Sequence, residues 1–176
     1  DVILIGEVRT RQTMEYSVQF AETGHLCLAT LHANNANQAL DRIIQFFPPE
    51  QHGQIWMDLS LNLRAIVAQQ LVPTPDGKGR NAVIAVLITT PLAADLIRKG
   101  DVHKLKDLMA KSNEIGMRTF DQALYELYSE GSVTYEDALA HADSANDLRL
   151  MIKLGTDAQG ADKLSSSVDK LTIQQD

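Results

Sequence analysis

The sequence predicts an α/β part followed by a helical part, with a boundary near residue 90. Two short apolar runs flank a helical pattern near the beginning of the chain, which is typical of a parallel βαβ unit. After Pro91 the sequence instead carries a series of short helical patterns with helix-start signals. Of the 176 residues, 44% are hydrophobic, an ordinary value for a globular protein with a core.

The first predicted strand covers residues 2–5, an unbroken apolar run closed by Gly6. Such runs suit the strands of parallel sheets, which are buried on both faces. A helix is predicted over residues 11–22, because its apolar residues share one side and Gly24 can form a left-handed cap after it. A second strand-length run follows over residues 25–32. This order predicts a right-handed crossover between two parallel strands.

The middle of the α/β part is predicted to be mostly helical. A helix over residues 38–46 is broken by Pro48 and Pro49, and a long helix is predicted from there to about Leu71. Its apolar positions recur at helical spacing: Ile55, Leu59, Leu63, Ile66 and Val67. The segment PTPDGKGR is a turn by composition and resembles a hairpin loop that leads into a buried strand at residues 81–89.

The helical part is predicted from its capping patterns. Three pairs mark helix starts: Thr119 with Gln122, Thr134 with Asp137, and Ser144 with Asp147. The last segment is rich in Asp, Ser, Gln and Gly and is predicted to be disordered. We therefore expect three regions: residues 1–90, 91–154 and 155–176.

Charge and cysteine content exclude several classes of function. The formal net charge is −7, which argues against binding to nucleic acid or to an anionic membrane surface. The single cysteine, Cys27, allows neither a disulfide within the chain nor a multi-cysteine metal site. No apolar run approaches the roughly 18–20 residues that span a bilayer. Because the chain starts at Asp1, inside a strand pattern, we expect the natural N-terminus to lie upstream.

The segment DVILIGEVR carries the first chemical signal. Its apolar strand delivers Glu7 to the carboxyl edge of the predicted sheet, where α/β proteins bind their ligands. A carboxylate in this position can hold Mg²⁺ through water or orient a water molecule toward a γ-phosphate. The alternative is a solvated glutamate that merely follows a core strand.

Two histidines bracket the second predicted strand. His25 and His32 are seven positions apart, so an extended strand puts them on opposite faces and they are unsuited to share one metal ion. His32 falls at the same sheet edge as Glu7, whereas His25 stands at the opposite edge. An imidazole near a phosphate can sense it. For either histidine alone, a structural role is the alternative.

The combined pattern is more specific than its parts. VILIGEVR, a helix, AETGHL and then TLH resemble the Walker B and histidine boxes of the secretion and type IV pilus ATPase superfamily. ALDRIIQFFPPEQ and LSLNLRAIVAQQLV further resemble the pilus retraction ATPases, the PilT/PilU group. The resemblance runs from Asp1 to about Ile152.

This resemblance implies the C-terminal part of a RecA-like P-loop ATPase core followed by a small helical domain. It also implies ATP and Mg²⁺ as cofactors, a homo-hexameric ring, and a place in the cytoplasm against the inner membrane at the pilus base. The implied partners are a PilT-type paralogue and the pilus inner-membrane platform protein, with no nucleic acid. The residues implied to be catalytic are Glu7 and His32, and those implied to bind or sense nucleotide are Asp1, Arg9, Gly24 and His25.

The P-loop is not in this sequence. No G-x-x-x-x-G-K-[ST] pattern occurs, and GKG at residues 77–79 reads as a turn. In the family that resembles this chain, the P-loop lies upstream of Walker B. We therefore expect the chain to be a piece of a longer protein, inactive in ATP hydrolysis by itself, with the apolar faces of residues 2–5 uncovered.

Two further departures concern the retraction group. Thr10 follows Arg9 where the group commonly has Asp, and Arg11 and Gln12 are also unusual there. The segment LAADLIRK matches a helix, AIRNLIRE, on which retraction depends in the group, but Ala94 and Lys99 replace its first arginine and final acid. Both departures fit the accessory PilU type.

Three other interpretations stay open at this point. A type II secretion or pilus assembly ATPase would carry a four-cysteine zinc site after LRAIVAQQLV, where this chain has only PTPDGKGR. A non-catalytic ring-assembly or docking module would have a vestigial nucleotide site. A metal enzyme would use His25 and His32, against the opposite-face argument.

Overall fold

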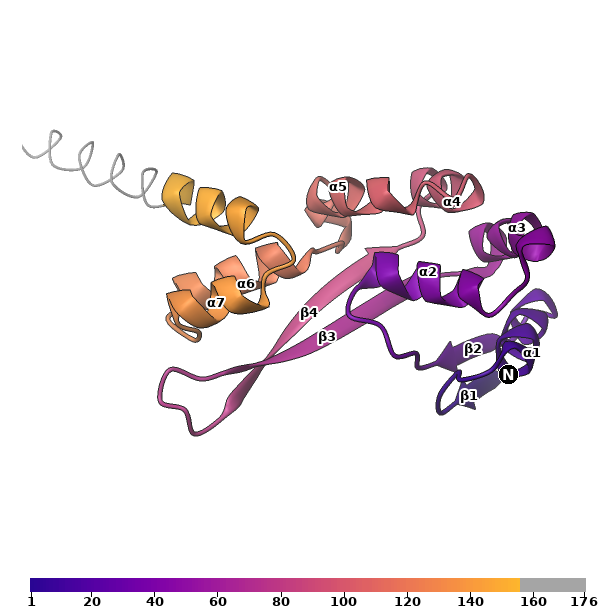
Figure 1. Cartoon of the computed structure of the whole chain (residues 1–176), viewed down its shortest axis with the longest axis horizontal. Coiled ribbons are helices and arrows are strands. Elements are labelled where there is room, and N and C mark those ends of the chain that lie inside the picture. The colour runs from indigo at the N-terminus through magenta and orange to yellow at the C-terminus, as the bar shows by residue number, and fades with distance from the viewer. Residues whose placement is uncertain (156–176) are drawn as a thin grey trace, which may run out of the picture. The chain divides into compact units, whose positions relative to one another are not determined.

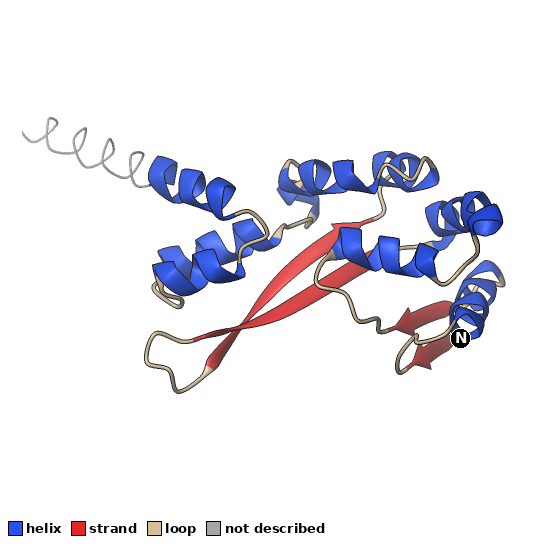
Figure 2. Cartoon of the chain, in the orientation of Figure 1, coloured by secondary structure: helices blue, strands red, loops and turns tan. Residues whose placement is uncertain are grey.

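A computed structural model of the chain describes residues 1–155 (Figure 1). The predicted disordered tail therefore lies, from residue 156 onward, outside the described residues. The α-helices and strands alternate at first (Figure 2). Within residues 1–155, three short 3-10 helices (η) connect some of them. In chain order the elements are β1 (Val2–Ile5), α1 (Arg11–Glu22), β2 (Leu26–Ala29), α2 (Ala36–Gln45), η1 (Pro49–Gln51), α3 (His52–Asn62), β3 (Ala65–Pro73), β4 (Arg80–Ile88), α4 (Pro91–Arg98), η2 (Val102–Lys104), α5 (Leu105–Ala110), η3 (Asn113–Ile115), α6 (Phe120–Ser129), α7 (Tyr135–His141) and a helix through 145–155.

The chain divides into two compact units. The first comprises residues 1–71 and 82–119, and the second comprises residues 72–81 together with the chain from residue 120. The last strand ends at Ile88, just before the predicted boundary near residue 90, but α4 and α5 belong to the first unit. The division into an ATPase-core part and a helical domain stays a prediction.

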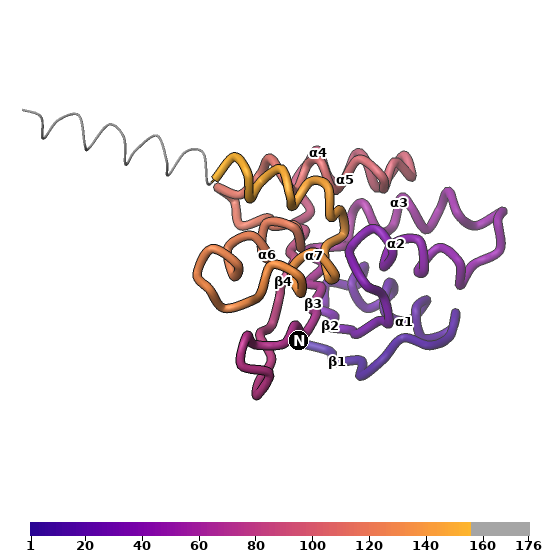
Figure 3. Tube along the Cα trace, turned by 60° about the vertical axis from the view of Figure 1, so that its left-hand side comes forward, coloured from indigo at the N-terminus to yellow at the C-terminus, as the bar shows by residue number. Residues whose placement is uncertain are grey.

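β1 and β2 form a parallel pair, as the βαβ pattern predicts. The register aligns Val2 with Leu26 and Ile5 with Ala29. Helix α1 connects the two strands and lies beside β2 (Figures 1 and 3). Its buried side carries Met14 and Val18, the spacing of one helical turn, so the predicted helix and its inward face are confirmed.

One face of the β1–β2 pair is apolar and exposed. Val2 and Leu4 are 65% and 75% exposed, and their register partners Leu26 and Leu28 are about half exposed. Within residues 1–155 no third strand joins this sheet. The expectation of an uncovered face at residues 2–5 is confirmed, whereas burial on both faces is not seen in the described part of the chain.

The prediction of a long helix that reaches Leu71 is wrong. Helix α3 ends at Asn62, and β3 pairs with β4 in a second two-stranded sheet. Exposure along β3 alternates residue by residue, with Ala68 and Val72 buried. These two are four positions apart, a spacing that fits both a strand and one turn of a helix. Pairing with β4 decided the outcome, because each strand satisfies the other's backbone hydrogen bonds.

The hairpin turn between β3 and β4 is confirmed. The Thr74 N–H donates to the Gly79 carbonyl at 3.0 Å, and the Thr74 hydroxyl contacts Asp76 and accepts from the Gly79 N–H. Gly77 has a φ of +68°, the left-handed region that glycine adopts without steric cost. The segment PTPDGKGR thus forms the turn of a β-hairpin and not a phosphate-binding loop.

Helix α2 supplies much of the core of the first unit. Asn35 caps it by accepting from the Gln38 N–H at 2.9 Å, so the helix begins slightly earlier than predicted. The proline pair ends it as expected, with Pro49 opening η1. One face of α2 is buried, namely Ala36, Ala39, Leu40, Ile43 and Ile44.

In the second unit the predicted caps are confirmed for two helices. The Thr134 hydroxyl accepts from the Asp137 N–H at 3.1 Å, and Ser144 accepts from the Asp147 N–H at 3.3 Å. Helix α6 begins at Phe120, directly after Thr119. Most buried apolar side chains of this unit come from these helices and the turns beside them: Phe120, Ala123, Leu124, Val133, Ala138 and Leu148.

Candidate nucleotide-facing edge of the parallel strands

Glu7 lies just beyond the carboxyl end of β1, as predicted. Its Oε1 is 3.1 Å from Nε2 of His32, which follows the end of β2. Its Oε2 accepts a hydrogen bond of 2.6 Å from Nε of Arg9, and the second guanidinium nitrogen contacts the same oxygen. The two parallel strands thus bring Glu7, Arg9 and His32 together at one edge, with both carboxylate oxygens engaged.

The other three candidate residues lie at the opposite edge. The Asp1 carbonyl accepts from the Leu26 N–H at 3.1 Å, next to His25. Gly24 ends the α1 turn with a φ of +87°, as its predicted capping role requires. His25 contacts the Thr23 hydroxyl at 3.1 Å. Because each strand is four residues long, about 13 Å of sheet separates the two edges, so His25 and His32 share no site.

Positive charge surrounds the Glu7 carboxylate. The hydrogen bond from Arg9 is the main cause that lowers the pKa of Glu7 below its ordinary value, although partial desolvation opposes it. The charges of His32 and Arg42 lower the pKa further. Glu7 is therefore ionised at neutral pH and stays so at lower pH than an isolated glutamate.

Arg42 is a member of this environment that sequence reasoning missed. It lies on α2, near the last turn of that helix, ten positions after His32. The sequence feature that could have pointed to Arg42 is its position in ALDRII. It is a cation between the buried Leu40 and Ile43, on a helix that starts soon after His32. That signal does not name Glu7 as a group that the charge of Arg42 influences, because Arg42 lies on a different element, α2, far from Glu7 in the sequence.

Replacing Arg9 with glutamine should raise the pKa of Glu7 toward its ordinary value of about 4.3, because the strongest stabiliser of the carboxylate is removed. Carboxyl carbon chemical shifts followed against pH would measure this. Arg11→Gln is the matched control, since Arg11 pairs with Glu15 at 2.7 Å on the same segment and should leave Glu7 unchanged. An identical Glu7 titration in wild type and Arg9→Gln would contradict the assignment.

This edge offers a metal ion one carboxylate. Among residues 1–155 no group of three or more His, Cys, Asp or Glu could hold a metal ion. Mg²⁺ prefers six oxygen ligands and usually keeps several waters beside a carboxylate or two and phosphate oxygens. Glu7 therefore fits contact with a nucleotide-bound Mg²⁺ through water, and the residues described do not fit a protein-only Mg²⁺ cage.

Comparison with known proteins identifies the family. Residues 1–139 match the family described as Type II/IV secretion system protein. The chain belongs to this family. It is 75% identical to the type IV pilus ATPase PilU of Pseudomonas aeruginosa over 174 residues, which are 99% of this chain and 45% of PilU. It is 34% identical to the type IV pilus retraction ATPase PilT of the same organism, over 78% of this chain and 40% of PilT.

A solved structure agrees with these relatives. The crystal structure of the pilus retraction motor PilT with bound ADP matches with a TM-score of 0.76 and 36% identity, over 85% of this chain and 41% of that one. The predicted resemblance to the PilT/PilU group and the α/β ATPase fold are confirmed. The chain spans less than half the length of these relatives. None of the helices in residues 1–155 has the length and apolar character that a bilayer span requires.

Thr10, the residue that departs from the pattern expected of the retraction group, has a structural role. Thr10 is the N-cap of α1, and its hydroxyl oxygen accepts from the Thr13 N–H at 3.2 Å. Ser, Thr, Asp and Asn are the residues that perform this capping role. The departure therefore preserves the start of α1 and leaves Arg9, one residue earlier, in contact with Glu7.

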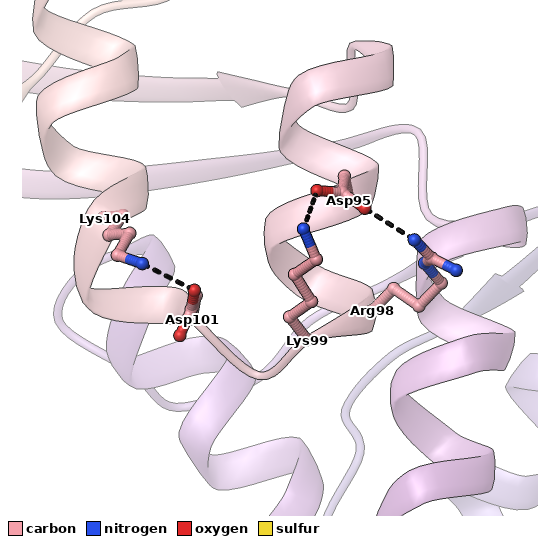
Figure 4. A network of polar contacts seen from close by, with 5 residues as sticks. All are labelled: Asp95, Arg98, Lys99, Asp101 and Lys104. Atoms are coloured by element: carbon pink, nitrogen blue, oxygen red, sulfur yellow. Dashed lines mark hydrogen bonds and ion pairs between the residues drawn. The ribbon is translucent and has the colours of Figure 1, made fainter.

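The segment matching the group's AIRNLIRE helix is α4, which Thr90 caps through the Ala93 N–H. Asp95 contacts Arg98 and Lys99, each at 2.6 Å, and Asp101 contacts Lys104 at 2.7 Å (Figure 4). Lys99, which replaces the acid of the motif, is thus paired within its own helix. These pairs are solvent-exposed, so each contributes little to the stability of the fold.

Proposed function

We propose that the full-length protein is a hexameric, ATP-hydrolysing motor that powers type IV pilus retraction. One observation carries the proposal: a Walker B-type carboxylate, Glu7, stands at a parallel strand end between Arg9 and His32. The 75% identity to PilU supports the same assignment and favours the retraction branch over the assembly and secretion branches. The retained Glu7–His32 pair speaks against a vestigial nucleotide site.

The roles follow from the chemistry of each side chain. Glu7 would orient or activate the water that attacks the γ-phosphate, or would hold a nucleotide-bound Mg²⁺ through water. His32, 3.1 Å from Glu7, senses the γ-phosphate from the neighbouring strand end. The Arg9 side chain is exposed and can leave Glu7 for a phosphate, because exposed ion pairs are weak. At the opposite edge, the nucleotide-sensing roles of Asp1, Gly24 and His25 stay predictions that rest on family position.

The proposed assembly follows from the family. We expect a homo-hexameric ring in the cytoplasm against the inner membrane, acting beside a PilT-type paralogue on the pilus inner-membrane platform protein. Native mass measurement of the full-length protein with and without nucleotide checks the ring. A monomer under both conditions would contradict it.

Calorimetry with ATP and Mg²⁺ tests the nucleotide assignment. The full-length protein should bind ATP with micromolar affinity and hydrolyse it, whereas this chain alone should show no binding up to millimolar ATP, because it has no P-loop to hold the β- and γ-phosphates. Absence of both binding and hydrolysis in the full-length protein would overturn the proposed function. Micromolar binding by this chain alone would instead overturn the requirement for the P-loop.

A further inference from the structure

Thr30 hydrogen-bonds to the chain on both sides of Glu7. It directly follows β2, and its carbonyl accepts from the Val8 N–H at 2.9 Å. Its hydroxyl donates to the Gly6 carbonyl. The two bonds continue the connection between the strands beyond the last register pair and enclose the peptide units that carry Glu7.

The backbone conformations of Gly6 and Val8, the two neighbours of Glu7, are held by different interactions. Val8 is 4% exposed, so burial and its bond to Thr30 both hold it. Gly6 has no side chain, and a Cβ built on it would meet nothing within 4 Å. Glycine has the largest backbone freedom of any residue. The Thr30 hydroxyl is therefore a specific restraint on the peptide from which Glu7 emerges.

Thr30 also lies close in sequence to His32, the residue that pairs with Glu7. His32 follows it by two residues and reaches Oε1 of Glu7 at 3.1 Å. The segment that presents His32 and the segment that presents Glu7 are thus joined at Thr30, just before the two side chains meet at the edge of the sheet.

We propose that Thr30 is a positioning residue, whose hydroxyl holds the Gly6 peptide so that Glu7 and His32 face the nucleotide in a fixed relative geometry. This inference rests on the proposed ATP hydrolysis. A displacement of about 1 Å at a reacting group can lower the rate about 10²-fold, so loss of the single Thr30 hydroxyl should have a measurable effect on kcat.

The test compares Thr30→Val with Thr30→Ser in the full-length protein. Valine keeps the branched shape and removes the hydroxyl, whereas serine keeps the hydroxyl and removes the methyl group. We expect Thr30→Val to lower kcat about 10- to 100-fold with the KM for ATP within about twofold of wild type. Thr30→Ser should stay within about threefold of wild-type kcat.

Thr74→Val is the matched control. The Thr74 hydroxyl also bonds a backbone group, the Gly79 N–H at 3.0 Å, but in the β3–β4 turn of the other compact unit. This variant should leave kcat and KM unchanged. Melting temperature and circular dichroism establish that each variant is folded, and Thr30→Ala replaces Thr30→Val if the latter does not fold.

The outcomes separate the inference from the function on which it rests. Equal kcat in Thr30→Val and wild type, or equal losses in Thr30→Val and Thr30→Ser, would overturn the positioning role. A loss confined to ATP affinity would also overturn it, since it would indicate a binding role. If the wild-type full-length protein neither binds nor hydrolyses ATP, the proposed function fails, whereas a dead Glu7→Ala beside a fully active Thr30→Val leaves the function standing and removes only the role of Thr30.

Discussion

Glu7→Ala in the full-length protein should reduce ATP hydrolysis by about 10²- to 10⁴-fold while largely sparing ATP binding. The carboxylate acts on the attacking water, and the backbone cradle that holds the phosphates lies elsewhere in the family. The pKa of Glu7 is lowered mainly by the Arg9 hydrogen bond, so the wild-type group is an ionised base over the whole neutral range. Steady-state turnover and calorimetric ATP affinity, measured on the same preparation, separate the two effects.

Glu15→Ala is the matched control for this experiment. Glu15 is an acid on α1 that pairs with Arg11, so its removal takes away one carboxylate and one ion pair without touching the strand-end edge. It should retain wild-type turnover. Unchanged turnover in Glu7→Ala would remove the catalytic assignment, and a parallel loss of binding would indicate a structural defect.

Leu40→Ala should destabilise the first compact unit by about 2–5 kcal/mol. Leu40 is fully buried on the inward face of α2, and its truncation leaves a cavity among apolar neighbours. Urea denaturation of this chain, followed by circular dichroism, measures the loss as a lower midpoint.

Leu61→Ala provides the comparison of the same chemistry at an exposed site. Leu61 lies on α3 and is 66% exposed, so its truncation should change the free energy of unfolding by less than about 0.5 kcal/mol. Equal effects of the two substitutions would contradict the burial assigned to α2.

Much of the strand-end site could be predicted because parallel strands have a fixed polarity. An acid after one strand and a histidine after the next must reach the same sheet edge, and Glu7 and His32 do so at 3.1 Å. Arg42 and Thr30 could not be predicted in the same way. The charge of Arg42 lowers the pKa of Glu7 from a separate element, α2, and Thr30 acts through a hydrogen bond across the strands to the Gly6 carbonyl.

Local chemistry by itself determined several elements. The bounds of β1 and α1 follow from an apolar run, helical spacing and a glycine stop, and Thr134 and Ser144 cap helices because their hydroxyls bond the N–H groups three residues on. The turn between β3 and β4 follows likewise from its Pro, Asp and Gly content. In each case the deciding interactions lie within a few residues of sequence.

Only the tertiary structure decided residues 63–73 and the exposure of β1. The apolar spacing of Ala68 and Val72 suits a helix and a strand equally, and hydrogen bonding to β4, a partner whose presence local spacing does not encode, selected the strand. The apolar sequence of β1 likewise does not state what covers it, and in residues 1–155 the face carrying Val2 and Leu4 is open. Both outcomes depend on partners distant in sequence, because backbone pairing and burial are satisfied between elements and not within them.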